Sequence, residues 1–324
     1  MSNDPGNRGI DARVEPTGDM FDEMTVPTKW DRDTARRALD ELFTYAHQYK
    51  SSKDCSELLR FVASFRFYSP YNAMLIYTQM KGARYVAPAH RWMRDYGRQI
   101  KVGARPLVIL QPMGPVMFVF DVADTEPGPC ARQLPPAVEK PFEVRKGRTG
   151  TPGTQPRLTI ENAKRDGVCI TERSQGSQSA GSIQSCAPGR FVDVLAKLKP
   201  LETYEKVPLR YELLLNANYS VESRYSTLVH ELAHLYCGHL GSPNDKWWPV
   251  RLGLPLAAKE FEAESVCYLV CSRLGIDNPS AQYLSGYVEQ NEDTPPISLD
   301  LIMKAAGLIE QMGRERMKPR GSTT

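Results

Sequence analysis

The segment His230-Glu231-Leu232-Ala233-His234 constrains this chain more than any other feature, because its spacing has a chemical meaning only on a helix. Residues four apart lie one turn apart on the same helix face, so both imidazoles can hold one metal ion with Glu231 beside it. Neutral imidazole suits zinc, and such a glutamate can take a proton from water. The alternative is that the motif occurs by chance. Its surroundings argue against chance, because Ser220 resembles a helix N-cap and Gly238 stands where a helix would end.

A catalytic zinc takes three protein ligands and leaves a position for water, so a third donor is required. On the helix expected after Pro255, Glu260 and Glu264 share a face that Glu262 does not. We predict that Glu260 is the third ligand and that Glu264 orients a ligand histidine, with Glu264 as the reserve ligand. The alternative is that these glutamates form only a solvated helix face.

His239 is the nearest further histidine, and we predict that it lies on the surface. It follows Gly238, and the longer zinc motif with a third histidine is not met, because Cys237 and Leu240 stand at the positions of its glycine and histidine.

The chain of 324 residues is long enough for two domains. Residues 1–29 have no apolar period and are expected to be disordered. A first domain is predicted over 30–122, a linker rich in Pro and Gly over 123–156, a second domain over 157–313 and a disordered tail over 314–324. No apolar run reaches the roughly 20 residues of a membrane span, and no secretory leader is evident, so we expect a cytoplasmic protein.

Apolar spacing, caps and turn residues predict the secondary structure. In the first domain we predict helices over 33–46, around 58–65, from Ser69-Pro70 to Met80 and over 88–96, then a hairpin of 106–110 with 116–122. In the second we predict helices over 158–165, 221–237, 257–274, 279–290 and 298–312, and a strand over 209–216. The fold class is therefore α+β, with an N-terminal helical bundle plus a hairpin or small sheet, and a C-terminal small sheet with helices.

Positive charge collects between residues 81 and 105, although the net charge of the chain is only +3. This segment contains a single acid, Asp95, and its basic residues are interleaved with Tyr85, Trp92 and Tyr96. Cations that meet phosphates and rings that stack on bases are what single-stranded nucleic acid binding needs. We predict DNA contacts at Lys81, Arg84, Arg91, Trp92, Arg94, Arg98, Lys101 and Arg105. The alternative is that the rings belong to the core and the cations are simply solvated.

Three further features allow two interpretations each. Trp247 and Trp248 line a substrate cleft or anchor a packed loop. The strand around Leu213 pairs with an extended substrate or is a plain core strand. Cys267 and Cys271, one turn apart, are expected to be core residues rather than ligands.

The zinc motif followed by Glu260-x-x-Ala263-Glu264 resembles the ImmA/IrrE-type metallopeptidases and the C-terminal domain of ArdC-type antirestriction proteins. This resemblance implies a zincin-like domain and independently favours Glu260 as the third ligand. The segment from Ser69 to Val122 resembles the N-terminal domain of the ArdC type, which implies binding of single-stranded DNA. The turn Lys101-Val102-Gly103-Ala104-Arg105 only partly matches that pattern.

We therefore predict an endopeptidase with one Zn²⁺ that acts on a protein, such as a regulator or repressor, and is coupled to DNA binding. Glu231 is its expected general base and proton donor. The rival hypothesis is a DNA-binding antirestriction protein whose metal domain is structural or does not cleave proteins. A third is a regulator of a transcriptional repressor, in which either cleavage or mere binding of the repressor switches transcription.

Overall fold

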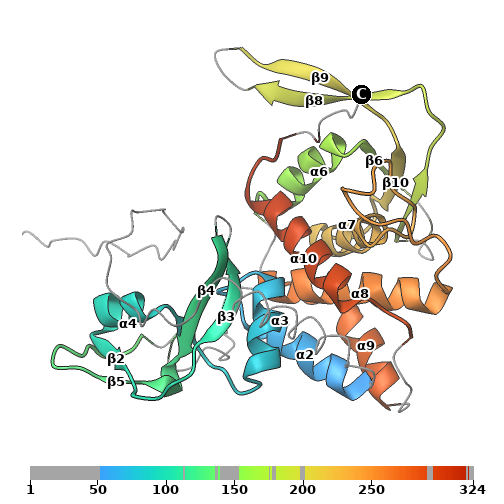
Figure 1. The fold of residues 1–324 in the computed structure, drawn as a ribbon. Helices are drawn as coiled ribbons and strands as arrows, with labels where there is room; N and C mark the ends of the chain where they lie inside the picture. The colour runs from blue at the N-terminus through green and yellow to red at the C-terminus, as the bar shows by residue number, and fades with distance from the viewer. Residues whose placement is uncertain are drawn as a thin grey trace, which may run out of the picture.

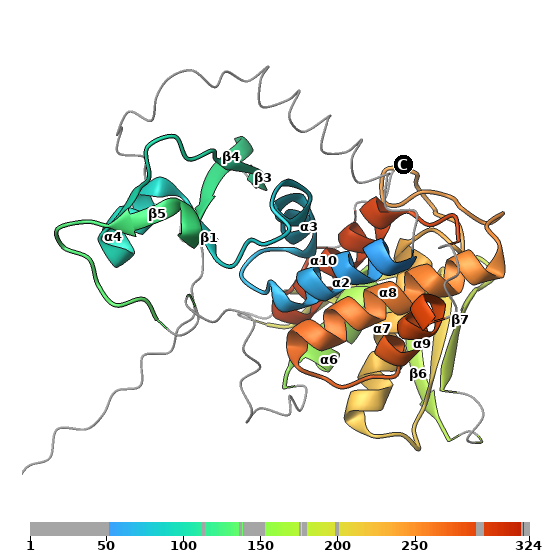
Figure 2. The same cartoon turned by 90° about the horizontal axis from the view of Figure 1, so that it is seen from below.

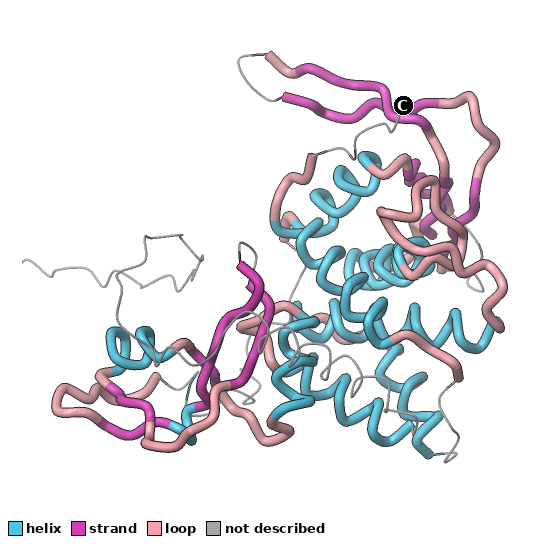
Figure 3. The backbone as a smooth tube through the Cα atoms, viewed as in Figure 1, coloured by secondary structure: helices cyan, strands magenta, loops and turns pink. Residues whose placement is uncertain are grey.

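A computed structural model describes residues 52–111, 114–135, 138, 153–174, 176, 180–197, 201–289, 295–318 and 320. Its helices are α2 (Ser52–Ser64), α3 (Pro70–Gln79), α4 (Ala89–Tyr96), α6 (Gln155–Arg165), α7 (Val221–Tyr236), α8 (Leu256–Leu274), α9 (Ser280–Glu289) and α10 (Leu299–Arg314). Its strands are β1 (Val86–Ala87), β2 (Arg98–Ile100), β3 (Leu107–Gln111), β4 (Gly114–Asp121), β5 (Thr125–Pro127), β6 (Val168–Arg173), β7 (Gly181–Ser185), β8 (Phe191–Lys197), β9 (Thr203–Pro208) and β10 (Tyr211–Asn216). The α+β class is confirmed, with the sheets small and the helices other than α4 gathered together (Figure 3).

Local capping explains where the helices begin, and the predicted helices within the described residues are confirmed. The Ser69 hydroxyl accepts a hydrogen bond from the Asn72 amide at 3.3 Å, with proline at the first helical position of α3. The Ser220 hydroxyl likewise accepts a hydrogen bond from the Ser223 amide at 3.2 Å and caps the start of α7. The helix predicted over 33–46 and the lead-in over 1–29 lie outside the described residues.

One continuous apolar core joins the helices of both halves of the sequence. It contains Leu59 of α2, Met74 of α3, Leu232 of α7, Val266 of α8 and Ile302 of α10. Helix α2 packs on α8, and α3 packs on α10, so residues 52–79 lie against the body formed by the C-terminal helices (Figure 1). The predicted division into two independent domains stays a prediction.

The sheet beside α7 has the strand order β6-β10-β7. Strand β10 runs parallel to β6 and antiparallel to β7, so both of its edges are already paired. Of the two interpretations of this strand, the plain core strand is the correct one, because no backbone groups remain on β10 for an extended substrate. Among the described strands, β6 and β7 form the two edges of this sheet.

Strands β1 to β5 form a small N-terminal module with α4 that lies to one side of the helical body (Figure 2). The predicted hairpin is confirmed as β3 and β4, which form a three-stranded sheet with β1. The predicted linker begins with structure, since Val122–Asp124 is a 3₁₀ turn and β5 pairs with β2. The expectation that residues from 123 onward lack regular structure is therefore wrong at this end; the linker's residues 136–137 and 139–152 lie outside the described residues.

Two further segments complete the fold. Strands β8 and β9 pair as an antiparallel arm that projects from the body (Figure 1). Part of the predicted disordered tail is held in place, because the Arg320 guanidinium donates to Asp166 and Arg316 to Glu161, both at 2.9 Å. Among the described residues, no helix combines the length and apolar character that a membrane crossing requires.

Candidate metal centre

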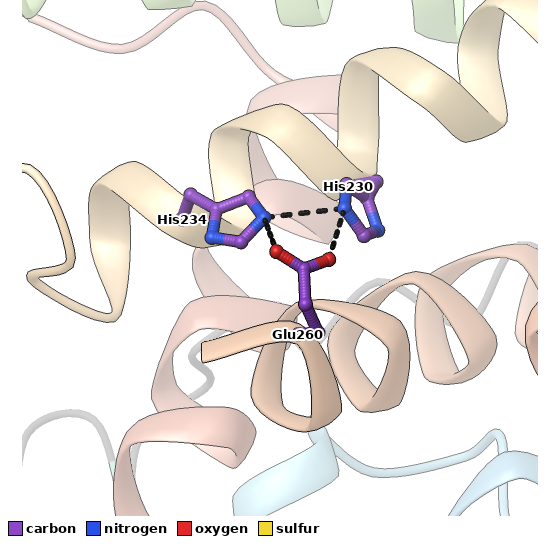
Figure 4. Close-up of side chains that lie close together, drawn as sticks. All are labelled: His230, His234 and Glu260. Atoms are coloured by element: carbon purple, nitrogen blue, oxygen red, sulfur yellow. Dashed lines mark hydrogen bonds and ion pairs between the residues drawn. The ribbon is translucent and has the colours of Figure 1, made fainter. Parts of the chain in front are cut away.

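Helices α7 and α8 pack against each other and bring the predicted ligands together. His230 and His234 project from α7 toward Glu260, which projects from the first turns of α8 (Figure 4). The two imidazole Nε2 atoms lie 3.2 Å apart. The Glu260 carboxylate places one oxygen 3.5 Å from His230 Nε2 and the other 3.6 Å from His234 Nε2.

This spacing fits a single tetrahedral ion. Ligand atoms about 2.0–2.2 Å from a tetrahedral zinc lie about 3.3–3.6 Å from one another. The two nitrogens are 3.2 Å apart, just below that range, and the two Glu260 oxygens lie within it, one 3.5 Å from His230 Nε2 and the other 3.6 Å from His234 Nε2. Two imidazole nitrogens and one carboxylate also form a donor set that zinc commonly takes in catalytic sites. The residues present therefore fit the ion that the sequence implies.

The remaining predicted site residues flank these three. Glu264, one turn after Glu260 on α8, places a carboxylate oxygen 3.5 Å from His230 Nδ1, the nitrogen that does not face Glu260. Glu231 lies next to His230 on α7, and burial raises the pKa of its carboxyl group. The charge of Glu260 raises this pKa too, whereas the charge of His230 and a hydrogen bond from the Ile183 backbone lower it. The arrangement gives Glu264 the place expected for a residue that orients His230.

The carboxylates create a strongly cation-stabilising environment. Burial alone lowers the pKa of His230, but its hydrogen bond to Glu260 and the charge of Glu264 raise that pKa to about 9. The pKa of His234 is lowered by burial and by the charge of His230. The pair thus favours one positive charge at this position, and a second proton is disfavoured.

His239 is not on the surface, and that prediction is wrong. The residue is 3% exposed. Gly238 has a φ of 83°, which reverses the chain after α7 and turns His239 back so that its Nδ1 lies 2.9 Å from His234 Nδ1. Its Nε2 lies 2.8 Å from a carboxylate oxygen of Glu262. One signal in the sequence could have indicated this position: the helix-ending Gly238 directly before the histidine.

Glu262 and Arg251 are functional candidates that the sequence reasoning missed. Glu262 is fully buried, so the alternative of a solvated helix face does not describe this helix. The Arg251 guanidinium donates to both Glu262 oxygens at 2.6 and 2.7 Å, and the Ser298 amide donates to one of them at 2.6 Å. Those bonds and that of His239 hold the pKa of Glu262 below its usual range despite burial, which acts in the opposite direction.

Cys237 lies with His239 and Glu262 in a second group whose potential ligand atoms are within 4.8 Å of one another. A thiol must lose its proton to bind a metal, and complete burial raises the pKa of Cys237 well above its usual value. The Glu262 oxygens are already engaged by Arg251 and Ser298. This group is therefore better described as a support of the first one.

Trp247 and Trp248 anchor a packed loop, which is one of the two interpretations of the sequence. Trp248 is 4% exposed and donates its indole N–H to the Gly241 carbonyl at 2.8 Å. The Arg320 guanidinium lies 5.7 Å from the Trp247 ring centre and 5.5 Å from that of Trp248. Cys267 and Cys271 are buried in the core, as predicted.

The basic residues predicted for DNA contact are distributed over the N-terminal module. Lys81, Arg84, Arg94, Lys101 and Arg105 are exposed, and Arg91 and Arg98 are partly exposed. Arg84, Arg98 and Lys101 line a hollow of about 370 Å³ together with Val122, Thr125 and Leu134.

Trp92 does not belong in that set, and its prediction as a stacking residue is wrong. Its ring is fully buried among Tyr85, Ala87 and Val122, and its indole N–H donates to the Phe120 carbonyl at 2.9 Å. Phe67, which the sequence reasoning missed, is 53% exposed and contacts Tyr85 edge to face.

Comparison with known proteins gives only distant similarity. No family model matches the chain. An uncharacterized protein from Bacillus anthracis is 21% identical over 309 residues, covering 81% of this chain and 48% of that protein. The chain thus spans about half the length of that curated relative. The solved metal-free structure of the antirestriction protein ArdC from plasmid R388 is 16% identical, with a TM-score of 0.30, covering 76% of this chain and 82% of that one.

Proposed function

We propose that this protein is a zinc-dependent endopeptidase whose ion is held by His230, His234 and Glu260. The observation that carries the proposal is the convergence of the three side chains, whose potential ligand atoms all lie within 4.8 Å of one another, close enough for one ion. A zinc ion held there supplies a Lewis acid and lowers the pKa of water. Glu231, beside His230 on α7, takes the proton of the attacking water on its carboxylate and delivers it to the leaving amide nitrogen. Its raised pKa brings it closer to the pH at which a base works best.

The edge strand β7 supports a protein as the substrate. Cys186 donates to the Arg210 carbonyl and Asn216 to that of Ala180, and antiparallel pairs alternate, so the backbone groups of Gly181, Ile183 and Ser185 point away from β10. The Ile183 backbone also hydrogen-bonds Glu231. An extended peptide that pairs with this edge would lie beside the proposed base.

The decisive variant is Glu231→Gln, with Glu222→Gln on the same helix as the matched control. The protein is incubated with zinc and fluorescent casein or a mixed peptide library, and bound metal is counted by mass spectrometry. Loss of a general base lowers the rate by about 10²–10⁴-fold. We expect Glu231→Gln to keep one zinc and lose cleavage, and Glu222→Gln to keep both. Cleavage by Glu231→Gln at the rate of the unaltered protein rules the mechanism out.

A second function, binding of single-stranded DNA, is favoured by the basic hollow of the N-terminal module. Arg84, Arg98 and Lys101 surround it, and the exposed Phe67 offers a ring for stacking in place of Trp92. This function underlies the rival hypothesis, in which protection of entering DNA is the main role and the metal domain cleaves nothing.

The DNA hypothesis is tested with labelled oligothymidine by fluorescence anisotropy over a salt series. Arg84→Ala with Lys101→Ala is expected to weaken binding and reduce the salt slope by about two phosphates, and Phe67→Ala to weaken binding at all salt concentrations. Arg157→Ala, which removes a distant exposed cation, is the control. Unchanged affinity in the first two variants excludes this surface. Protection of DNA that survives both His230→Ala and Glu231→Gln favours the rival hypothesis over the peptidase.

A further inference from the structure

We propose that His239 is a positioning residue that fixes His234 as a metal ligand through Nε2, and that Glu262 and Arg251 hold His239 for this task. The inference rests on the proposed metal centre and extends it to residues outside the zinc motif. It begins from the chain of contacts that runs from His234 Nδ1 to His239 Nδ1 at 2.9 Å, and from His239 Nε2 to Glu262 at 2.8 Å.

Counting protons leaves one arrangement for a metal-binding state. His234 must offer a lone pair on Nε2, which faces Glu260 and His230, so a neutral His234 carries its hydrogen on Nδ1. Within the described part of the chain, His239 Nδ1 is the atom that lies there to accept that hydrogen, and it can accept only if its own hydrogen is on Nε2. That Nε2–H then donates to the Glu262 carboxylate. Each donor in the series meets one acceptor.

Glu262 is held so that it must accept rather than donate. The Arg251 guanidinium binds both carboxylate oxygens, and the Ser298 amide binds one of them. A carboxylate that receives two N–H groups of a guanidinium stays ionised, even at zero exposure. The hydrogen of His239 is therefore kept on Nε2, and its Nδ1 lone pair is kept on the side of His234.

The two imidazole ligands consequently have different partners. His230 Nδ1 faces the Glu264 carboxylate directly at 3.5 Å, whereas His234 Nδ1 faces a neutral imidazole. The charge of Glu262 reaches His234 only through His239 and is balanced by Arg251. A plain core role would explain burial of His239, but not the alignment of both of its nitrogens between a predicted ligand and an ionised acid.

The test measures zinc affinity of the full chain by competition with a chromophoric chelator. Removing the partner of a ligand histidine costs about 10–100-fold in metal affinity. We expect that loss for His239→Leu, which cannot accept a hydrogen bond, and partial recovery for His239→Gln, whose amide can accept from His234 and donate to Glu262. His90→Gln, at an exposed histidine of α4, is the control and should bind as the unaltered protein does.

Two readouts separate positioning from stability. The melting temperature of the metal-free variants reports packing alone, and a purely structural His239 would lower it while leaving zinc affinity within twofold. Because His239→Leu can fail to fold, ¹⁵N spectra of the imidazoles in the unaltered zinc-loaded protein give an independent test. We expect His239 to carry its hydrogen on Nε2; a hydrogen on Nδ1 overturns the proposal. Failure of the unaltered protein to bind zinc refutes the metal centre itself, whereas tight binding by folded His239→Leu refutes only the role of His239.

Discussion

The contacts of Arg273 allow a quantitative prediction about how the two halves of the chain are joined. This residue lies in the last turn of α8, and its side chain is 2% exposed. Its guanidinium donates to Glu310 of α10 at 2.5 Å and to the carbonyls of Val62, Phe65 and Tyr68 at 2.8, 2.9 and 2.6 Å. One cation therefore satisfies the C-terminal end of α2, the following turn and a buried acid of α10.

Arg273→Met keeps an apolar side chain of similar reach and removes all of these bonds. Glu310 is left with Arg314 at 3.2 Å, and the three carbonyls lose a buried donor. Breaking a buried ion pair by removing one partner costs about 3–5 kcal/mol. A loss of about 4 kcal/mol is a large part of a total stability of about 5–15 kcal/mol. At about 2–4 °C per kcal/mol, the midpoint should fall by about 8–16 °C.

Urea and thermal unfolding, followed by circular dichroism, measure this change. Lys304→Met is the matched control, because its pair with Asp300 is 61% and 31% exposed and should contribute less than about 1 kcal/mol. Amide exchange should show α2 opening earlier in Arg273→Met than in the unaltered protein. A loss below about 1 kcal/mol in Arg273→Met would refute the reasoning, because it would mean that the bonds of Arg273 do not contribute to holding α2 on α8.

Two further predictions concern the metal centre. Gly238→Ala places a Cβ 2.1 Å from the Pro249 carbonyl oxygen at a φ of 83°. We therefore expect thermal denaturation to show a loss of more than about 2 kcal/mol in the free energy of unfolding. Gly253→Ala, where nothing lies within 4 Å of the added Cβ, is the control and should change little. Zinc at about 1,000 times its Kd stabilises a folded protein by about 4 kcal/mol. This stabilisation should disappear in Glu260→Ala and persist in part in Glu264→Ala. The reverse result would make Glu264 the ligand.

Features set by neighbours along the chain were predictable from the sequence. Ser69 and Ser220 begin α3 and α7 through hydrogen bonds that span only three residues. That a glutamate of α8 lies near both histidines was predictable too, because helical spacing places Glu260 and Glu264 on one face and the zinc motif requires a third donor; the preference for Glu260 came also from the family resemblance. In these cases a local rule and a chemical requirement point to the same residue.

Features set by distant partners were not predictable in the same way. Glu262 is a charged residue among charged residues, and its burial depends on Arg251 and Ser298, which approach from other segments. Trp92 has basic neighbours in the sequence, but its ring is held by the Phe120 carbonyl, 28 residues later. Strand β10 was recognised as a strand, whereas its central position depends on β6 and β7, which no local pattern orders.

The stretch between the two ligand helices illustrates why the motif alone describes only half of this site. A metal motif identifies atoms that touch the ion, and by that criterion the residues after His234 are a spacer. In the fold, Gly238 returns the chain toward the ligands, His239 meets His234, and Arg251 reaches both the Cys237 carbonyl and Glu262. Since loss of the partner of a ligand imidazole weakens metal binding about 10–100-fold, we propose that these residues belong to the site together with the zinc motif.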